Sequence, residues 1–184
     1  NEAYDGSAGV WLLDPYNFFL DANDLSTLNT ALNASNVSIL TSNSSNSGID
    51  SVFNSSHAGG YQIGSGHIVF ENDFTYTGGN NRTLTLTADA DIYLKGISSS
   101  NAALSLDINA TGDQVYLDGD ISTNGGYLDI SSQDVHLQKV GNQTLQTSGG
   151  NINFNSSNIK LLKSGGTASI NSGSGSLNTG SGSV

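Results

Sequence analysis

A pair of short alternating segments returns through the second half of the chain at intervals of two dozen residues or fewer. The successive copies are TLTLTADADIYLKGISSSNA, ALSLDINATGDQVYLDGDISTNGG, YLDISSQDVHLQKVGNQTLQTSGG, NINFNSSNIKLLKSGG and a fading TASINSGSGSLNTGSGSV. Each copy carries two apolar–polar–apolar stretches and closes in small or polar residues. Such a repeat, near 20 residues long with strand-like alternation, is typical of a stacked β-solenoid. We therefore expect an all-β chain folded as a parallel β-helix.

The apolar pairs of the copies align when the copies are stacked. Alternation puts both members of a pair on one face of a strand, and stacked strands lie about 4.8 Å apart. Two apolar walls that face each other are predicted, with Ile97 and Ile121 on a third side. The first wall should hold Leu84/Leu86, Leu104/Leu106, Leu128/Ile130, Ile152/Phe154 and Ala168/Ile170, and the second Ile92/Leu94, Val115/Leu117, Val135/Leu137 and Ile159/Leu161.

Glycine pairs punctuate the copies, at Gly78/Gly79, Gly125/Gly126, Gly149/Gly150 and Gly165/Gly166. We assign them to tight corners, where the backbone needs a positive φ. At roughly 20 residues per rung, a single β-helix of about 8–9 rungs is expected. Within 1–184, irregular rungs are predicted for 1–82, regular rungs for 83–166, and a Gly/Ser-rich terminal rung or frayed end for 167–184.

The first third of the chain is less regular. Strands are predicted within 9–20, 36–42 and 67–79. Between the first two, leucines recur at helical spacing, at Leu25, Leu28 and Leu32. We expect a short helix or compact excursion near 21–35, with Asn23 or Asp24 as its N-cap.

Composition removes several function classes. The chain has 184 residues and a formal net charge of −11, from 16 acidic and 5 basic residues. Five scattered cations do not form the phosphate-neutralising patch that nucleic-acid binding needs, nor a surface for anionic membranes. No apolar run approaches the roughly 18 residues of a membrane span. The absence of cysteine removes disulfides and thiolate metal sites.

Two segments of the first third resemble a known family. GVWLLDPYNFFL followed by NVSILTS resembles the recurring W-L-x-D-P…N-V-x-I-x-T module of the filamentous-haemagglutinin-like adhesins, the two-partner secretion exoproteins of Gram-negative bacteria. LTLTADADIYLKGIS and LSLDINATGDQVYLDGDIS resemble the rung consensus of that family, and the resemblance covers most of 9–166. The family's Asn-Pro-Asn secretion motif has no counterpart here, so this piece would be shaft.

The resemblance implies a right-handed β-helix that is secreted through an outer-membrane transporter to the cell surface. It also implies roles in adhesion, biofilm cohesion or contact-dependent killing. Partners would then be glycans or proteins on host or neighbouring cells. The fold and the secretion route are expectations at this point, and the receptor is not identified.

Eight Asn-x-Ser/Thr sequons occur, at Asn33, Asn36, Asn43, Asn54, Asn81, Asn109, Asn142 and Asn155. One interpretation is glycosylation, because some adhesins of the resembled family carry hexoses at such sequons. The other is that stacked side-chain amides form ladders at β-helix turns, which makes asparagine frequent.

Carboxylates near the rung corners are candidate Ca²⁺ ligands, namely Asp89/Asp91, Asp113 and Asp118/Asp120. Ca²⁺ takes several oxygen ligands, but no EF-hand loop or nonapeptide calcium repeat occurs. Solvated turn acids are the favoured interpretation, and no cofactor is expected. His57, His67 and His136 lack metal-ligand spacing, and His136 should point outward because its neighbours point inward.

An enzyme is a further class, because many β-helices act on polysaccharides. Glycoside hydrolysis needs paired carboxylates across a cleft, and lyases need cations, whereas Arg82 is the only arginine. We expect no enzymatic activity.

Tyr93 and Tyr116 alternate with inward pair residues of aligned rungs, so they should stack on the outer face. They are candidates for a small carbohydrate- or protein-binding strip, although a surface ladder explains them equally well. The expected function is a secreted, non-enzymatic adhesin or fibre shaft. The alternatives are a self-assembling filament joined end to end and, third, a polysaccharide-acting enzyme or phage-type fibre module.

Overall fold

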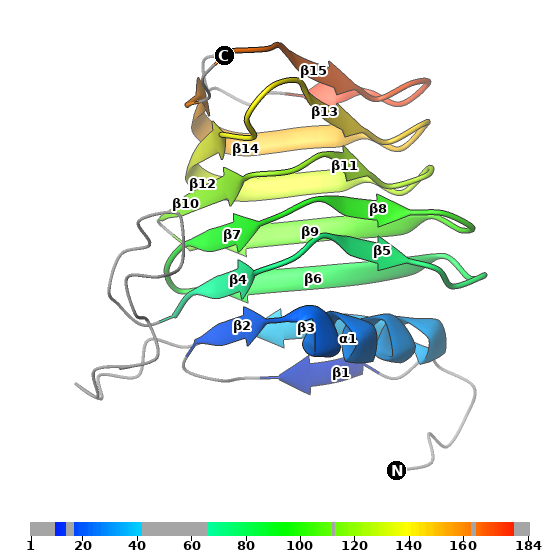
Figure 1. Cartoon of the computed structure of the whole chain (residues 1–184). Helices are drawn as coiled ribbons and strands as arrows, with labels where there is room; N and C mark the ends of the chain where they lie inside the picture. The colour runs from blue at the N-terminus through cyan, green and yellow to red at the C-terminus, as the bar shows by residue number, and fades with distance from the viewer. Residues whose placement is uncertain (1–9, 14–16, 42–65, 112, 163–164, 179–184) are drawn as a thin grey trace.

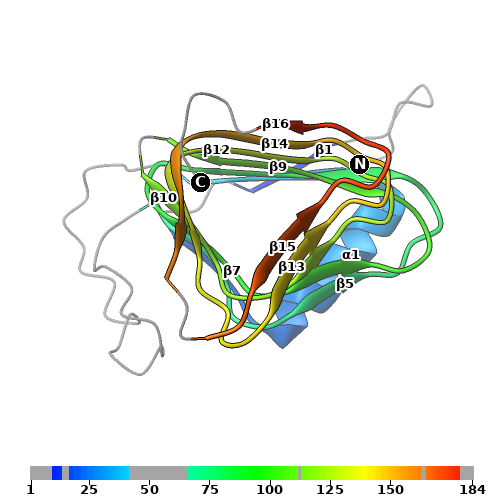
Figure 2. The same cartoon turned by 90° about the horizontal axis from the view of Figure 1, so that it is seen from above.

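A computed structural model of the chain describes residues 10–13, 17–41, 66–111, 113–162 and 165–178. These residues form a coil of parallel strands with a three-sided cross-section (Figures 1 and 2). Seen from the C-terminal end, the chain runs counter-clockwise as it approaches the viewer, so the coil is right-handed. The parallel β-helix expected from the repeat is confirmed.

Three sides make up each turn. Side 1 contains β1 (Val10–Leu13), β3 (Asn36–Leu40), β6 (Arg82–Ala88), β9 (Leu104–Ala110), the first halves of β12 (Leu128–Leu137) and β14 (Ile152–Leu161), and β16 (Leu177–Asn178). Side 2 contains β2 (Phe18–Leu20), β4 (Ile68–Phe70), β7 (Ile92–Leu94), β10 (Gln114–Leu117) and the second halves of β12 and β14. Side 3 contains α1 (Ala22–Ala34), β5 (Phe74–Tyr76), β8 (Ile97–Ser99), β11 (Ile121–Ser122), β13 (Gln143–Gln146) and β15 (Ala168–Asn171).

Sides 1 and 2 belong to one 11-stranded sheet, because β12 and β14 run through the corner between them. Side 3 is a separate 5-stranded sheet. All of the described strand pairs are parallel, and they place like positions of successive turns beside one another. A residue that points outward in one turn therefore has its counterparts directly above and below it.

Four turns are complete, namely β6–β8, β9–β11, β12–β13 and β14–β15. The expectation of about 8–9 rungs is therefore wrong. Phe18 pairs with Ile68, whereas Ile68 pairs with Ile92, so the earlier turn uses about twice as much chain as the later one. That earlier turn contains α1 and the stretch 42–65, which lies outside the described residues.

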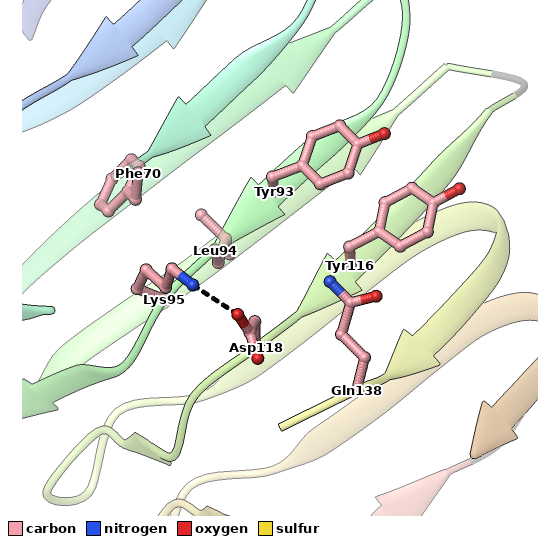
Figure 3. Close-up of a pocket in the computed structure, with 7 residues that line it drawn as sticks. All are labelled: Phe70, Tyr93, Leu94, Lys95, Tyr116, Asp118 and Gln138. Atoms are coloured by element: carbon pink, nitrogen blue, oxygen red, sulfur yellow. Dashed lines mark hydrogen bonds and ion pairs between the residues drawn. The ribbon is translucent and has the colours of Figure 1, made fainter. Parts of the chain in front are cut away.

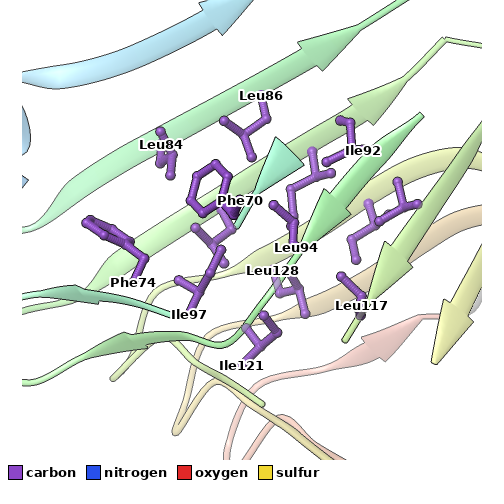
Figure 4. Packing of buried hydrophobic residues seen from close by; sticks show 14 of the residues in the cluster. Phe70, Phe74, Leu84, Leu86, Ile92, Leu94, Ile97, Leu117, Ile121 and Leu128 are labelled. Atoms are coloured by element: carbon purple, nitrogen blue, oxygen red, sulfur yellow. The ribbon is translucent and has the colours of Figure 1, made fainter. Parts of the chain in front are cut away.

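The inward residues form one continuous core along the coil (Figure 4). Leu84, Leu106 and Leu128 stack in register, so the predicted alignment of Leu84 with Leu104 is wrong by two residues. A shift of two keeps every side chain on its face, which is why the inward assignment still holds. Burial of each such side chain stabilises the fold by about 1.5–3 kcal/mol.

Side 3 is the part of the core that the pattern identified least well. The third side expected at Ile97 and Ile121 is confirmed, and Leu145 continues it. Ile170, predicted on the first wall with Ala168, instead pairs with Leu145 in side 3. Leu161, predicted to point inward, is 59 % exposed in the last described turns.

The helix α1 replaces a strand at the start of side 3, where it lies under β5 (Figures 1 and 2). Its Leu25, Leu28 and Leu32 are buried in the core, as their spacing predicts. The N-cap is Asp21, whose Oδ1 accepts the N–H groups of Asn23 at 2.7 Å and Asp24 at 3.0 Å. The helix is confirmed. The N-cap expected at Asn23 or Asp24 is wrong, because the helix begins at Ala22 and both of those residues lie inside its first turn.

The corners between sides 3 and 1 repeat one arrangement. The hydroxyl groups of Ser99, Thr123, Thr147 and Ser172 each donate to the carbonyl three residues ahead. In this column the glycine pairs have two different roles. Gly125 and Gly149 adopt φ values of 96° and 125°, as expected. Gly126 and Gly150 are instead required for close approach, since an added Cβ would lie 2.3 and 2.1 Å from carbonyl oxygens of the preceding turn.

Not all of the expected glycine corners need positive φ. Gly165 and Gly166 adopt it, at 76° and 73°. Gly78 and Gly79 do not, so the prediction is wrong for that pair.

Candidate functional site

The outer surface of side 2 carries a group of aromatic and titratable side chains, and we call it the tyrosine face. Its central column runs in register through Val69, Tyr93, Tyr116, His136 and Lys160. A second column includes Gln114, Asp134 and Asn158, with Asp91 and His67 directly before the paired strands β7 and β4. A third includes Lys95, Asp118 and Gln138, directly after the paired positions Leu94, Leu117 and Leu137. Parallel pairing thus brings together residues from distant parts of the sequence.

Tyr93 and Tyr116 stack face to face on this surface. Their ring centroids are 4.4 Å apart and the planes are inclined by 2°. The stacking expected from the repeat is present, because strand spacing in the sheet fits the separation of two offset rings. Tyr93 is only 5 % exposed, whereas Tyr116 is half-buried, so Tyr116 offers the larger surface to a partner.

Both phenol hydroxyls are held by neighbours two residues away. Tyr93 donates to Asp91 Oδ2 at 3.1 Å, and Tyr116 donates to Gln114 Oε1 at 2.7 Å. Burial raises the pKa of Tyr93 and also that of Tyr116, so both phenols stay protonated in the neutral range. The rings are therefore fixed, uncharged platforms.

Asp91 is the most buried acid of the tyrosine face, at 3 % exposure. Its Oδ1 accepts the N–H of Gln114 from the next turn at 3.1 Å. The Nδ1 of His67, from the preceding turn, accepts the N–H of Asp91 at 3.2 Å. Burial is the main cause that raises the pKa of Asp91 to about 6, and the nearby Asp113 carboxyl adds to it. Burial also lowers the pKa of His67, which keeps that ring neutral.

His136 points outward from side 2, as its alternation predicts, but it is 6 % exposed. Its ring meets that of Tyr116 edge to face, with centroids 4.6 Å apart. Neither ring nitrogen has a hydrogen-bond partner among the residues that the structure describes. Burial is the main cause that lowers the pKa of His136, and the nearby Lys160 ammonium adds to it.

A shallow hollow lies beside the tyrosine pair (Figure 3). Its lining includes both tyrosines, the Lys95–Asp118 ion pair and the Gln138 amide, over a floor that includes Phe70 and Leu94. The enclosed space measures only about 10 Å³, about the room that one water molecule needs. The hollow is therefore too small to enclose a substrate.

The lysines that the structure describes all join successive turns. Lys95 pairs with Asp118, Lys139 with Asp120 at 2.5 Å, and Lys160 with Asp134 at 2.7 Å. Hydrogen bonds from Lys160 and Asn158 lower the pKa of Asp134. Arg82 is bound to α1, and Lys163 lies outside the described residues. The described part of the chain thus has no unpaired cationic cluster for an acidic ligand.

The acids predicted as Ca²⁺ candidates are distributed over separate corners. Asp118 and Asp120 pair with lysines, Asp91 is buried, Asp113 is half-buried, and Asp89 is exposed. Within the described ranges, no three His, Asp or Glu side chains gather in a way that could hold a metal ion. Of the histidines, His57 lies outside those ranges.

The sequon asparagines fall into several groups. The side-chain oxygens of Asn36, Asn81 and Asn142 accept N–H groups from the next turn, at 3.0, 3.0 and 3.1 Å. Asn155 instead donates its amide to Asp129 Oδ1 at 2.9 Å. Asn33 is exposed at the end of α1 and Asn109 is half-buried on β9, while Asn43 and Asn54 lie outside the described residues. The inter-turn bonds explain why asparagine suits these corners, and glycosylation stays a prediction.

The chain was also compared with known proteins. No protein-family model, no curated protein and no solved structure matches it. The structure describes no helix that is both long and apolar enough to cross a membrane. The resemblance to the adhesin family therefore rests on the sequence motifs alone.

Proposed function

We propose that this chain is part of the shaft of a secreted, non-enzymatic cell-surface adhesin or fibre protein. The observation that carries the proposal is the continuous stack of in-register turns, joined by parallel ladders on all three sides. A stack of this kind is a rod that repeats the same surface at each turn. It can hold a binding end away from a cell, or present many weak contacts whose avidity replaces a single strong site.

The charges of the tyrosine face favour neutral or cationic partners. Its described lysines are paired with aspartates, and acids outnumber bases in the chain by 16 to 5. A polyanionic glycan would meet net repulsion on such a surface. We infer that neutral glycans or basic protein segments on neighbouring cells are the partners, with Tyr116 as the contact platform.

The experiment is a binding screen against neutral and acidic glycan arrays and whole cells, with the chain displayed both as a monomer and as a multimer on beads. Multimer binding is expected to exceed monomer binding by about 10²-fold or more. Tyr116→Ala should remove most of the multimer signal. Tyr127→Ala is the matched control, because Tyr127 is also outward and partly exposed but lies on side 1.

Two results would contradict the shaft proposal. One is tight binding by the monomer that equals binding by the multimer. The other is the appearance of new reducing ends or unsaturated sugars when the chain is incubated with polysaccharides, which would reveal an enzyme.

A second candidate, a filament joined end to end, is supported by the last described turns. Leu161, Leu162 and Leu177 are 59 %, 56 % and 49 % exposed there. Among the described strands, β15 and β16 pair on one side only, and so does β1 at the opposite end of the coil. β16 and β1 both lie on side 1 with the same strand polarity, so a copy translated along the axis can continue the parallel ladder on that side.

Light scattering over a wide concentration range tests this candidate. End-to-end assembly predicts a mass that grows with concentration, and a Leu177→Lys change that holds the chain at the mass of a monomer. A constant monomeric mass at every concentration would rule the filament out, while leaving the shaft proposal open.

A further inference from the structure

The corner between β11 and β12 contains Asn124–Gly125, the one Asn-Gly dipeptide of the chain. Both residues have a left-handed backbone, with φ values of 51° and 96°. Asparagine and glycine are the residues that best tolerate two consecutive positive φ values, which explains the dipeptide in this tight turn. The corner joins the second complete turn of the coil to the third.

The side chain of Asn124 is exposed, and it makes no hydrogen bond within the described part of the chain. The corner residues Asn81 and Asn142 differ, because their side-chain oxygens accept N–H groups from the next turn. Gly125 follows Asn124 and has no Cβ, so its backbone nitrogen is the least hindered nucleophile that an asparagine can have beside it. The carbon Cγ of Asn124 and the nitrogen of Gly125 are therefore a reactive pair.

The fold controls the nitrogen of this pair. The N–H of Gly125 donates at 2.5 Å to the carbonyl oxygen of Thr147 in the next turn. A backbone nitrogen must give up its proton before it can form a new bond to carbon, and in the closed corner this proton is held by Thr147. Attack on Asn124 therefore requires that the corner first opens locally.

We propose that Asn124 is a self-modification site, at which the chain converts its own asparagine to aspartate and isoaspartate when the bond between Gly125 and Thr147 opens. The Gly125 nitrogen bonds to Cγ of Asn124, and the side-chain amide leaves as ammonia with the proton that this nitrogen gives up. Water then opens the resulting five-membered imide. Cleavage of the new bond to Cγ gives aspartate, whereas cleavage of the bond to the backbone carbonyl carbon gives isoaspartate.

Isoaspartate does not fit this corner, because it routes the backbone through the side chain and lengthens it by one methylene group. There is no room for the change, since an added Cβ on Gly126 would lie only 2.3 Å from the carbonyl oxygen of Leu104. The hydroxyl and the carbonyl of Thr123 both bond the backbone of Gly126, and these bonds depend on the length of the turn. We expect isoaspartate to loosen the coil between its second and third complete turns.

The next turn of the coil has the same corner without an asparagine. Ser148 and Gly149 adopt φ values of 56° and 125° there, and the N–H of Gly149 donates to the carbonyl oxygen of Ser172 at 2.9 Å. The turn thus forms with serine in place of asparagine, so Asn124→Ser is a matched variant that keeps the corner and removes the reactive amide. The proposal goes beyond the shaft function and does not depend on it.

The test is to incubate the chain at mildly alkaline pH in heavy-oxygen water, both folded and unfolded in urea, and to follow Asn124 by peptide mapping with mass spectrometry. Aspartate and isoaspartate are expected at this position, each with one heavy oxygen from the water. The folded chain should convert about 10–100-fold more slowly than the unfolded chain, because each attack must wait for local opening. The isoaspartate fraction should then unfold at a lower Tm than the unconverted chain.

Two variants place the reactivity at the corner. Asn124→Ser should abolish the conversion and keep the Tm of the unconverted wild type, whereas Ser148→Asn should add a second modified position in the next turn. Equal rates in the folded and unfolded wild type would overturn the proposal, because the bond to Thr147 would then control nothing. An unchanged Asn124 in the folded wild type, after about a hundred times the half-time measured in urea, would overturn it as well. Neither of these two results depends on the folding of a variant.

Discussion

The Nε of Arg82 donates a hydrogen bond of 2.8 Å to the carbonyl oxygen of Leu32, in the last turn of α1. The same guanidinium donates to the carbonyls of Asn33 and Ala34 at 3.2 Å each. Terminal carbonyls of a helix lack intrahelical partners and carry partial negative charge, so a cation there stabilises the helix end. Arg82 begins β6, and it thereby fixes the helix to the first complete turn.

Replacing Arg82 by alanine should therefore destabilise the fold by about 1.5–3 kcal/mol, the range for hydrogen bonds to a charged group. Urea unfolding followed by far-UV circular dichroism measures the loss. Arg82→Lys is the informative comparison, because a lysine keeps the charge but cannot reach three carbonyls with a planar fork, and it should recover only part of the stability. Equal stability of the alanine variant and the wild type would show that the contact contributes nothing.

Gly150 packs against the turn before it with no room for a side chain. An added Cβ would lie 2.1 Å from the carbonyl oxygen of Gly126, so Gly150→Ala must push two turns apart. We expect a loss of about 2–4 kcal/mol in the free energy of unfolding. Gly79→Ala is the control, since nothing lies within 4 Å of a Cβ there and φ is not positive. That variant should be neutral or slightly more stable, and similar losses in both variants would contradict the packing argument.

The stacked tyrosines should be energetically coupled. A double-mutant cycle with Tyr93→Ala, Tyr116→Ala and the double variant isolates their interaction from the loss of buried area. We expect a coupling of about 0.5–1.5 kcal/mol, the range for aromatic pairs. A coupling of zero would mean that the two rings do not stabilise each other. The strand pairing and the hydroxyl bonds to Asp91 and Gln114 would then hold them in place.

His136 predicts a loss of stability at acidic pH. Burial lowers the pKa of His136 below its ordinary value of 6.5, so the folded chain resists protonation. Its contribution to stability is present above pH 6.5 and is lost as the pH falls through the lowered pKa. His136→Phe removes this dependence together with two unpartnered nitrogens, and it should raise stability by about 1–3 kcal/mol.

Unfolding midpoints of His136→Phe and wild type between pH 5 and 8 measure this effect. The difference between the two proteins should grow as the pH falls. A difference that is constant with pH would indicate a packing effect without titration.

Alternation in the sequence predicted which residues face the core. Side chains of a strand alternate with a period of two, so an error of two residues in the alignment leaves every inward residue inward. It could not identify β13, since QTLQ is mostly polar. Gln143 is nonetheless buried, and its Nε2 donates to the carbonyls of Leu117 and Gly119 at 2.9 Å each. A buried amide that is satisfied by backbone leaves no apolar signal.

The tyrosine pair could be predicted, whereas its polar surroundings could not. Tyr93 and Tyr116 occupy equivalent positions in two copies that align by their apolar pairs. Asp91, Asp113 and His67 lie at corners where copy length varies, so their contacts depend on loop geometry that periodicity does not encode. The only sequence signal for this polar cluster was that His67 and Asp91 each directly precede an apolar strand of side 2.

The substitution of a helix for a strand at α1 has a mechanical consequence. In most of the coil, successive turns are held by ladders whose hydrogen bonds run along the axis and share a pulling force. On side 3, α1 is joined to the turn above it by side chains instead. Asn29 bonds the N–H and the hydroxyl of Thr77 at 3.1 and 3.0 Å, and Arg82 binds the helix end. Under tension along the axis, this junction carries force through side-chain bonds instead of a backbone ladder. Within the described part of the chain, rupture is expected to begin there and to leave the upper turns intact.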